Sequence, residues 1–174
     1  MRDGLVQKYG SAARQEAATL RLLHAHNVPV PRVTDCREHQ LTLEHLSGEP
    51  LPDLIERGSY EPRVLAFALC DWFAAFYAAM PGLSRGDVNG RNFLYDGVRI
   101  VSVDFEDALV PGSPAHDAGR LAAFLVTYDT HYPALRADLT THFTKEFATR
   151  FGCSTDEIRE ETALELVAMQ KRRA

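Results

Sequence analysis

The residues best suited to chemistry lie in one stretch near the middle of the chain. Asp87 is followed five positions later by Asn92, and Asp104 ends the next apolar strand that the sequence predicts. Carboxylate and amide oxygens suit Mg²⁺, and these three side chains can converge on one divalent metal. Phosphoryl transfer needs such a metal, neutralised charge on the transferred group and an oriented acceptor hydroxyl. The trio can supply those functions.

The elements that must position these residues follow from apolar periodicity and from Pro and Gly breaks. Residues 4–9 predict a short strand carrying Lys8, and Ser11 is expected to cap a helix that reaches about His26. Residues 32–36 and 40–45 predict two further strands. Together the three strands can form a small antiparallel sheet.

The second part of the chain predicts helices around a central hairpin. Residues 61–80 read as a long helix that is apolar on nearly all sides. Asp96-Gly97 is a strong turn signal between strands at 92–95 and 98–103. Beyond Pro114 three helical segments follow, and the last opens with a capping box. The expected fold class is therefore α+β.

This order of elements and residues resembles the protein-kinase-like superfamily, particularly its aminoglycoside-phosphotransferase-like and small atypical kinase branches, over nearly the whole chain. The resemblance implies a two-lobed fold with a reduced N-terminal antiparallel sheet lobe and a mainly helical C-terminal lobe. It implies one domain over residues 1–174, with a truncated N-terminal lobe at 1–46 and a C-terminal lobe with the catalytic loop at 47–174.

The resemblance also implies roles for the central trio. Asp87 would be the catalytic base, Asn92 a magnesium ligand, and Asp104 the metal-binding Asp of an Asp-Phe-Gly-like motif that here reads Asp104-Phe105-Glu106. The implied cofactors are ATP and Mg²⁺. The alternative for the trio is a pair of surface turns, since acids beside Asn-Gly or Asp-Gly are common in loops.

Matches elsewhere in the chain argue against surface turns. Lys8 stands where the superfamily places its phosphate-binding lysine, and Glu16, on the next helix, would hold it. Glu16 also lies on the inward helical stripe, where a carboxylate needs a partner; pairing with Arg14 or Arg21 in solvent is the alternative. Glu44 and Leu46 occupy the hinge position, where backbone groups would bind adenine.

Two other residues keep open alternatives. Asp117 matches an Asp that anchors the catalytic loop in the superfamily, and equally suits the N-terminal dipole of a helix. Arg91 could reach a γ-phosphate or pair with Asp87 or Glu106.

The sequence also departs from the superfamily pattern. A Gly-rich strand pair has no counterpart ahead of Gly4, which suggests a minimal or truncated N-terminal lobe. Arg85 replaces the usual His of the catalytic loop, and Asn89 replaces its usual Lys or His. The acceptor class cannot be read from this loop. A pseudokinase that binds a nucleotide or a protein partner without turnover is therefore the alternative function.

Composition and net charge argue against several classes of partner and site. A net charge of −5 argues against nucleic-acid binding, which normally needs a basic surface. No stretch approaches the roughly 20 apolar residues of a membrane span, so membrane insertion is not expected. Three scattered cysteines indicate neither a disulfide framework nor a zinc cluster. The expectation is a cytoplasmic enzyme whose partners are a nucleotide and an unknown hydroxyl-bearing acceptor, either a small molecule or a protein.

Overall fold

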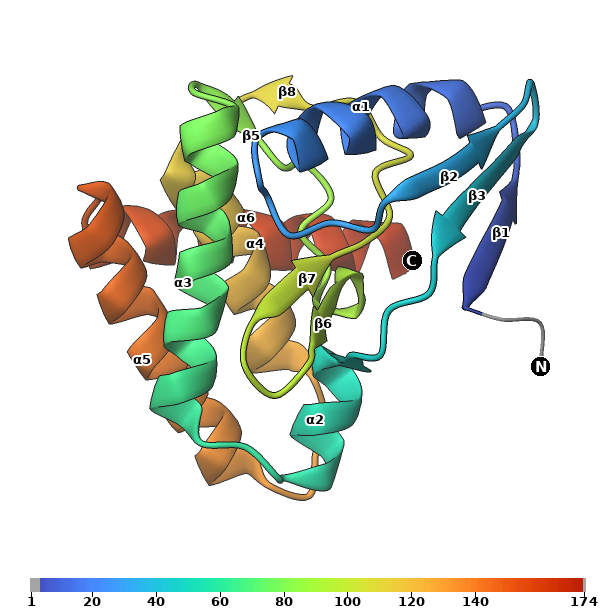
Figure 1. Cartoon of the computed structure of the whole chain (residues 1–174). Coiled ribbons are helices and arrows are strands. Elements are labelled where there is room, and N and C mark those ends of the chain that lie inside the picture. Colours follow the sequence, from blue (N-terminus) through green and yellow to red (C-terminus); the bar gives the residue numbers. More distant parts are fainter. Residues whose placement is uncertain (1–3, 174) are drawn as a thin grey trace.

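The computed structural model describes residues 4–173, and it has the predicted α+β architecture (Figure 1). The helices are α1 (Ala13–Ala25), α2 (Leu51–Arg57), α3 (Pro62–Ala79), α4 (Pro114–Thr127), α5 (Pro133–Phe151) and α6 (Thr155–Arg173), with a short 3-10 helix η1 (Gly90–Asn92). The strands are β1 (Leu5–Tyr9), β2 (Val33–Cys36), β3 (Gln40–Glu44), β4 (Glu49–Pro50), β5 (Leu83–Ser84), β6 (Phe93–Tyr95), β7 (Ile100–Ser102) and β8 (Val110–Pro111).

The N-terminal part is an antiparallel sheet of order β1-β3-β2, with α1 packed beside it (Figure 1). In its register Lys8 lies opposite Leu41, and Val6 lies opposite Leu43. Side chains two residues apart point to the same face of a strand. Val6 and Lys8 therefore face the same side, and both line the cavity between this sheet and the rest of the protein.

Helix α1 begins later than the sequence suggests. Ala12 is its N-cap residue, without a side-chain capping bond, so the expectation that Ser11 caps the helix is wrong. The chain turns at Gly10, whose carbonyl accepts from the N–H of Ala13, and Ala12 accepts from Glu16. These backbone bonds satisfy donors that a capping side chain would otherwise take.

Helix α3 forms the centre of the larger core. Trp72, Phe73 and Phe76 are at most 1% exposed, and Phe73 meets Phe147 of α5 with ring centroids 5.3 Å apart. By length and composition alone α3 could cross a bilayer, which corrects the expectation that no stretch qualifies. Its buried side chains are nevertheless part of the protein core.

Helices α4 and α6 approach each other unusually closely. A Cβ added to Gly119 of α4 would lie 2.4 Å from Cβ of Glu161 and 2.8 Å from the backbone nitrogen of Thr162. The predicted capping box of α6 is present: Glu157 N–H donates to Ser154 Oγ, and Ser154 N–H donates to the Glu157 carboxylate. Close packing with a defined helix start fixes α6 against α4.

The hairpin β6-β7 lies between Asn92 and Asp104 and is tied to both parts of the chain. Ser102 N–H and Trp72 Nε1 both donate to the carbonyl of Pro29, which follows α1. Val103 N–H donates to the carbonyl of Asn92. These bonds set the positions of η1 and of Asp104 relative to the first sheet.

Candidate active site

The side chain of Lys8 lies among three carboxylates. Its Nζ is 2.8 Å from Glu16 Oε2, 2.8 Å from Asp104 Oδ1 and 2.9 Å from Glu106 Oε1. An ammonium has three N–H donors, and each of them has a carboxylate here. Burial by itself lowers the pKa of Lys8, but the bonds to Asp104, Glu106 and Glu16 outweigh it and raise the pKa above its ordinary value. Lys8 is therefore charged and fixed in position.

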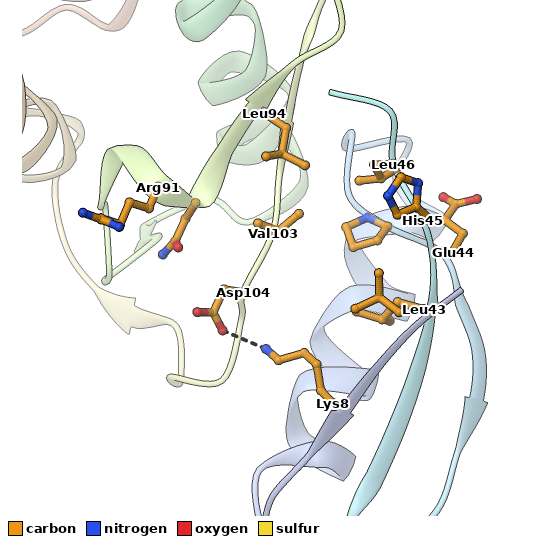
Figure 2. Close-up of a pocket in the computed structure, with 12 residues that line it drawn as sticks. Lys8, Leu43, Glu44, His45, Leu46, Arg91, Leu94, Val103 and Asp104 are labelled. Carbon is orange, nitrogen blue, oxygen red and sulfur yellow. Dashed lines mark hydrogen bonds and ion pairs between the residues drawn. The ribbon is translucent and has the colours of Figure 1, made fainter. Parts of the chain in front are cut away.

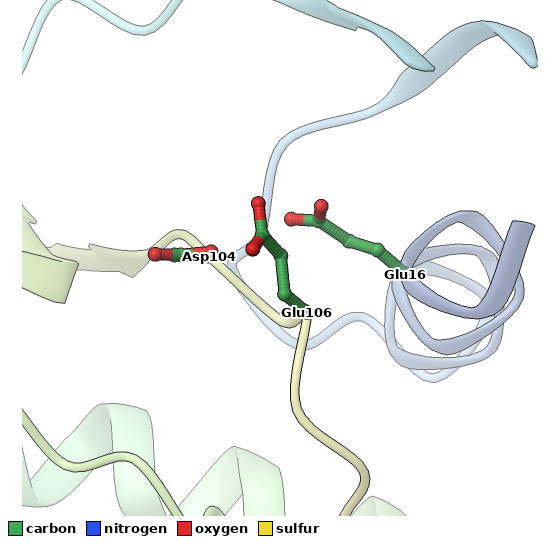
Figure 3. A group of neighbouring side chains, drawn as sticks. All are labelled: Glu16, Asp104 and Glu106. Atoms are coloured by element: carbon green, nitrogen blue, oxygen red, sulfur yellow. The ribbon is translucent and has the colours of Figure 1, made fainter. Parts of the chain in front are cut away.

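Glu16 is the buried member of this group. Its side chain projects from α1 towards Glu106 and Asp104 (Figure 3), and the residue is only 1% exposed. One carboxylate oxygen accepts from Lys8 and also from the backbone N–H of Phe105, at 3.1 Å. The predicted pairing of Glu16 with Lys8 is thus present, whereas Arg14 and Arg21 form no ion pair with it within residues 4–173.

Asp104 has a left-handed backbone, with φ of 64°, which is uncommon for a residue with a side chain. Arg85 holds one side of this turn, because its Nη2 donates to the carbonyls of Val103 at 2.7 Å and Asp104 at 2.6 Å. The Arg85 guanidinium also lies over the Phe105 ring, 4.4 Å from its centroid. Glu16 holds the other side through the Phe105 N–H. The turn aims the Asp104 carboxylate at Lys8 (Figure 2).

Asp87 and Asn92 form a second pair, in the loop that the sequence predicts to be catalytic. Asn92 Nδ2 donates to Asp87 Oδ2 at 2.9 Å, and Asn92 is only 7% exposed. Helix η1 brings the two together, and Gly90 makes this possible because a Cβ there would lie 2.1 Å from the Phe124 ring. The bond leaves the amide oxygen of Asn92 available for a cation.

Asp117 anchors the start of the same loop. It is fully buried, and its carboxylate accepts from Tyr77 Oη at 2.9 Å, from the Arg85 backbone N–H at 2.9 Å and from Ser84 Oγ. It also lies in the first turn of α4. The two alternatives for Asp117 are therefore compatible in the structure.

A cavity of about 440 Å³ lies between the N-terminal sheet and the hairpin (Figure 2). One wall carries Lys8, Glu44 and Leu46, and the other carries Arg91, Asn92 and Asp104. All of these residues were singled out from the sequence. The Glu44 carboxylate itself turns away, accepting from the Arg32 N–H at 2.8 Å. Hinge contacts with a ligand would therefore fall to the backbone around Leu46.

A second cavity, of about 640 Å³, lies on the other side of the catalytic loop. Asp87 and Asn89 line it from the loop, and Arg120 and Arg172 line it from α4 and α6. Asp87 thus faces a space separate from the one that contains Lys8. Arg91 is exposed, and among the described residues it forms no ion pair with Asp87 or Glu106.

The donor atoms present suit a hard divalent cation such as Mg²⁺, which prefers oxygen ligands. The amide oxygen of Asn92 and the second carboxylate oxygen of Asp104, which lies opposite the one bonded to Lys8, are both of this type. Glu16, Asp104 and Glu106 also bring carboxylate oxygens within 4.8 Å of one another (Figure 3), but the Lys8 ammonium already lies among them.

Two functional contacts were missed by sequence reasoning. Arg85 was noticed only because it replaces a His, and its buried bonds to the Asp104 turn were not foreseen. Glu106 was placed in the Asp104-Phe105-Glu106 motif and named as a partner for Arg91, but its contact with Lys8 was not predicted. The signal for Glu106 was its place two residues after Asp104, beside the residue that would hold a metal.

Known proteins resemble this chain over the region that forms the candidate site. The family model described as RIO domain matches residues 5–118, which include every residue of the Lys8 cluster and the catalytic loop. A relative in Schizosaccharomyces pombe, serine/threonine-protein kinase rio2, is 31% identical over 105 residues. The match covers 59% of this chain and 29% of the yeast protein, so the chain spans less than a third of that relative.

Proposed function

The chain belongs to the RIO domain family, within the protein-kinase-like superfamily, and we propose that it is an ATP- and Mg²⁺-dependent phosphotransferase. The observation that carries this proposal is the convergence of Lys8, Glu16 and Asp104, which are far apart in the sequence, beside the Asp87–Asn92 pair. A purely structural ion cluster would not need a second acid–amide pair at the next turn of the chain.

The nucleotide would occupy the cavity between the sheet and the hairpin. Leu43 and Leu46 offer apolar surface for a base, and Lys8 lies farther along the same cavity, where the phosphates would reach it. Glu16 would keep Lys8 in place during turnover. Asn92 and Asp104 would hold Mg²⁺, which would neutralise phosphate charge as the phosphoryl group is transferred.

Asp87 would orient the acceptor hydroxyl and accept its proton. Its carboxylate is exposed to the second cavity, while Asn92 fixes its orientation from behind. The acceptor would therefore enter from the side of Arg120 and Arg172. The proposed acceptor is either a small molecule or a protein segment that carries a hydroxyl. We also propose that the protein acts in the cytoplasm. Residues 1–174 would form a single domain, with an N-terminal lobe that ends at residue 46 and a C-terminal lobe that begins at residue 47.

Transfer and binding can be separated by changing Asp87 alone. We expect Asp87→Asn to lower phosphate release or transfer from γ-labelled ATP by about a hundredfold or more, as for loss of a general base. Nucleotide binding should be retained, because Asp87 does not contact the Lys8 cluster. Asp138→Asn, an exposed acid on α5 with the same loss of charge, is the matched control.

Two results would count against this proposal. Equal turnover by wild type and Asp87→Asn would assign the activity to another residue or protein. Nucleotide binding by the wild type without any turnover would favour the alternative, a pseudokinase that binds nucleotide or a partner. That alternative draws support from the saturation of all three Lys8 donors by the protein's own carboxylates.

A further inference from the structure

The three carboxylates around Lys8 are not equivalent. Glu16 is buried and also accepts from the Phe105 N–H, so it cannot leave without exposing an unpaired backbone donor. Asp104 is fixed by the turn that Arg85 holds. The side chain of Glu106 is 55% exposed, and among the described residues its carboxylate bonds only to Lys8. Glu106 is thus the partner that can move.

Lys8 has no N–H left for a phosphate while Glu106 is bound. The ammonium has three donors, and Glu16, Asp104 and Glu106 each place a carboxylate oxygen within 2.9 Å of it. A phosphate oxygen arriving at Lys8 must therefore take the place of a carboxylate. Because Glu106 is the most exposed of the three, its carboxylate occupies the place that a phosphate oxygen would take.

The net negative charge around Lys8 also disfavours the binding of a nucleotide that carries no metal ion. Three carboxylates surround one ammonium, so the cluster carries a formal charge of about −2 before any ligand arrives. A metal-free nucleotide brings further negative charge. With a divalent cation the phosphates are largely neutralised, and the approach to Asp104 and Glu106 is no longer repulsive.

We propose that Glu106 makes nucleotide binding depend on a divalent metal, because it occupies Lys8 in the free protein and repels phosphates that arrive without a cation. This inference rests on the proposed function, in that a nucleotide must bind at Lys8. It goes further by assigning a specificity role to Glu106: the site accepts the metal–nucleotide complex and rejects the free nucleotide.

Calorimetric titration with ADP, in Mg²⁺ and in EDTA, tests this role. The quantity compared is the ratio of the two dissociation constants, metal-free over metal-bound. We expect Glu106→Gln to lower this ratio by about tenfold, which corresponds to about 1.4 kcal/mol. The loss of one nearby negative charge should act mainly on metal-free ADP. Gln keeps the size of this exposed side chain, and unchanged thermal unfolding would verify that the variant folds normally.

Asp107→Asn is the matched control. Asp107 is the next residue, has the same charge and lines the other cavity, without contact to Lys8. In Asp107→Asn the ratio of the two ADP dissociation constants should stay within about twofold of the wild-type ratio, since exposed charges without direct contact are screened. Glu106→Ala should behave as Glu106→Gln does, because both remove the charge from Lys8.

The possible outcomes distinguish a wrong role for Glu106 from a wrong proposed function. An unchanged ratio in Glu106→Gln, with wild-type binding of Mg-ADP intact, would overturn the role of Glu106 and leave the proposed function standing. Equal weakening with and without metal would also overturn it, because that result means Glu106 merely positions Lys8. Absence of binding in the wild type and in every variant would contradict the proposed function itself and this inference with it.

Discussion

Asp104 carries a backbone conformation that costs a residue with a side chain about 1–3 kcal/mol, and its neighbours hold it there. Arg85 binds the two carbonyls of the turn, and Glu16 binds the N–H that follows. Such strain persists only where the surroundings over-determine it. Here the result is a carboxylate directed at Lys8 with one oxygen left for a cation.

We therefore expect Arg85→Met to destabilise the protein by about 3 kcal/mol, since two charge-assisted bonds are lost and two partly buried carbonyls lose their donor. Nucleotide binding should weaken as well, because the Asp104 turn relaxes. Urea unfolding measures the first effect and calorimetry the second. Arg91→Met, at an exposed position, should change stability by no more than about 0.5 kcal/mol. Wild-type stability in Arg85→Met would show that the turn is held by other contacts.

At the same scale, the sequence predicts which residues meet but not how. Lys8, Glu16 and Asp104 could be selected by type, order and helical face, and they do lie together. The contact of Glu106 with Lys8 depends on the left-handed turn at Asp104, which no local pattern signals. The burial of Arg85 is likewise a tertiary effect, because charged residues are rarely buried unless they are paired, and the partners of Arg85 lie 18 and 19 residues away in the sequence.

Among the elements, hairpin β6-β7 and helix α3 were predictable because a turn dipeptide and a long apolar run are strong local signals. The predicted N-cap of α1 was wrong by one residue, because backbone bonds at Gly10 and Ala12 replace a side-chain cap. The proximity of α4 and α6 could not be predicted. A glycine inside a helix suggests close packing without naming its partner.

The α4–α6 contact gives a prediction at this scale. We expect Gly119→Ala to lower the free energy of unfolding by about 1–2 kcal/mol, because the overpacking penalty exceeds the roughly 1 kcal/mol that Ala gains in a helix. Gly10→Ala is the control, since an added Cβ there meets nothing within 4 Å. Chemical denaturation measures the free energy of unfolding of both variants and of the wild type. A Gly119→Ala protein more stable than the wild type would mean that the helices separate without cost.

At the scale of the whole molecule, two parts with different architectures meet around one cavity. The sheet supplies Lys8, and the helical part supplies Asn92 and Asp104 through the hairpin. The carbonyl of Pro29 binds both Ser102 and Trp72, so the connection is built into the core. A ligand that bridges Lys8 and Asp104 should therefore stabilise the entire fold rather than one part of it.

Thermal unfolding with and without ATP and Mg²⁺ tests the central claim most directly. At about 100 times the dissociation constant, a ligand that binds only the folded state adds about 2.7 kcal/mol, or roughly 5–10 °C for a chain of this size. Asp104→Asn is the decisive variant, because Asn tolerates the left-handed backbone while losing the metal-binding charge. The account predicts a rise in midpoint that needs both ATP and Mg²⁺ and that Asp104→Asn abolishes. An equal rise in Asp104→Asn, or no rise in the wild type at millimolar ligand, would contradict it.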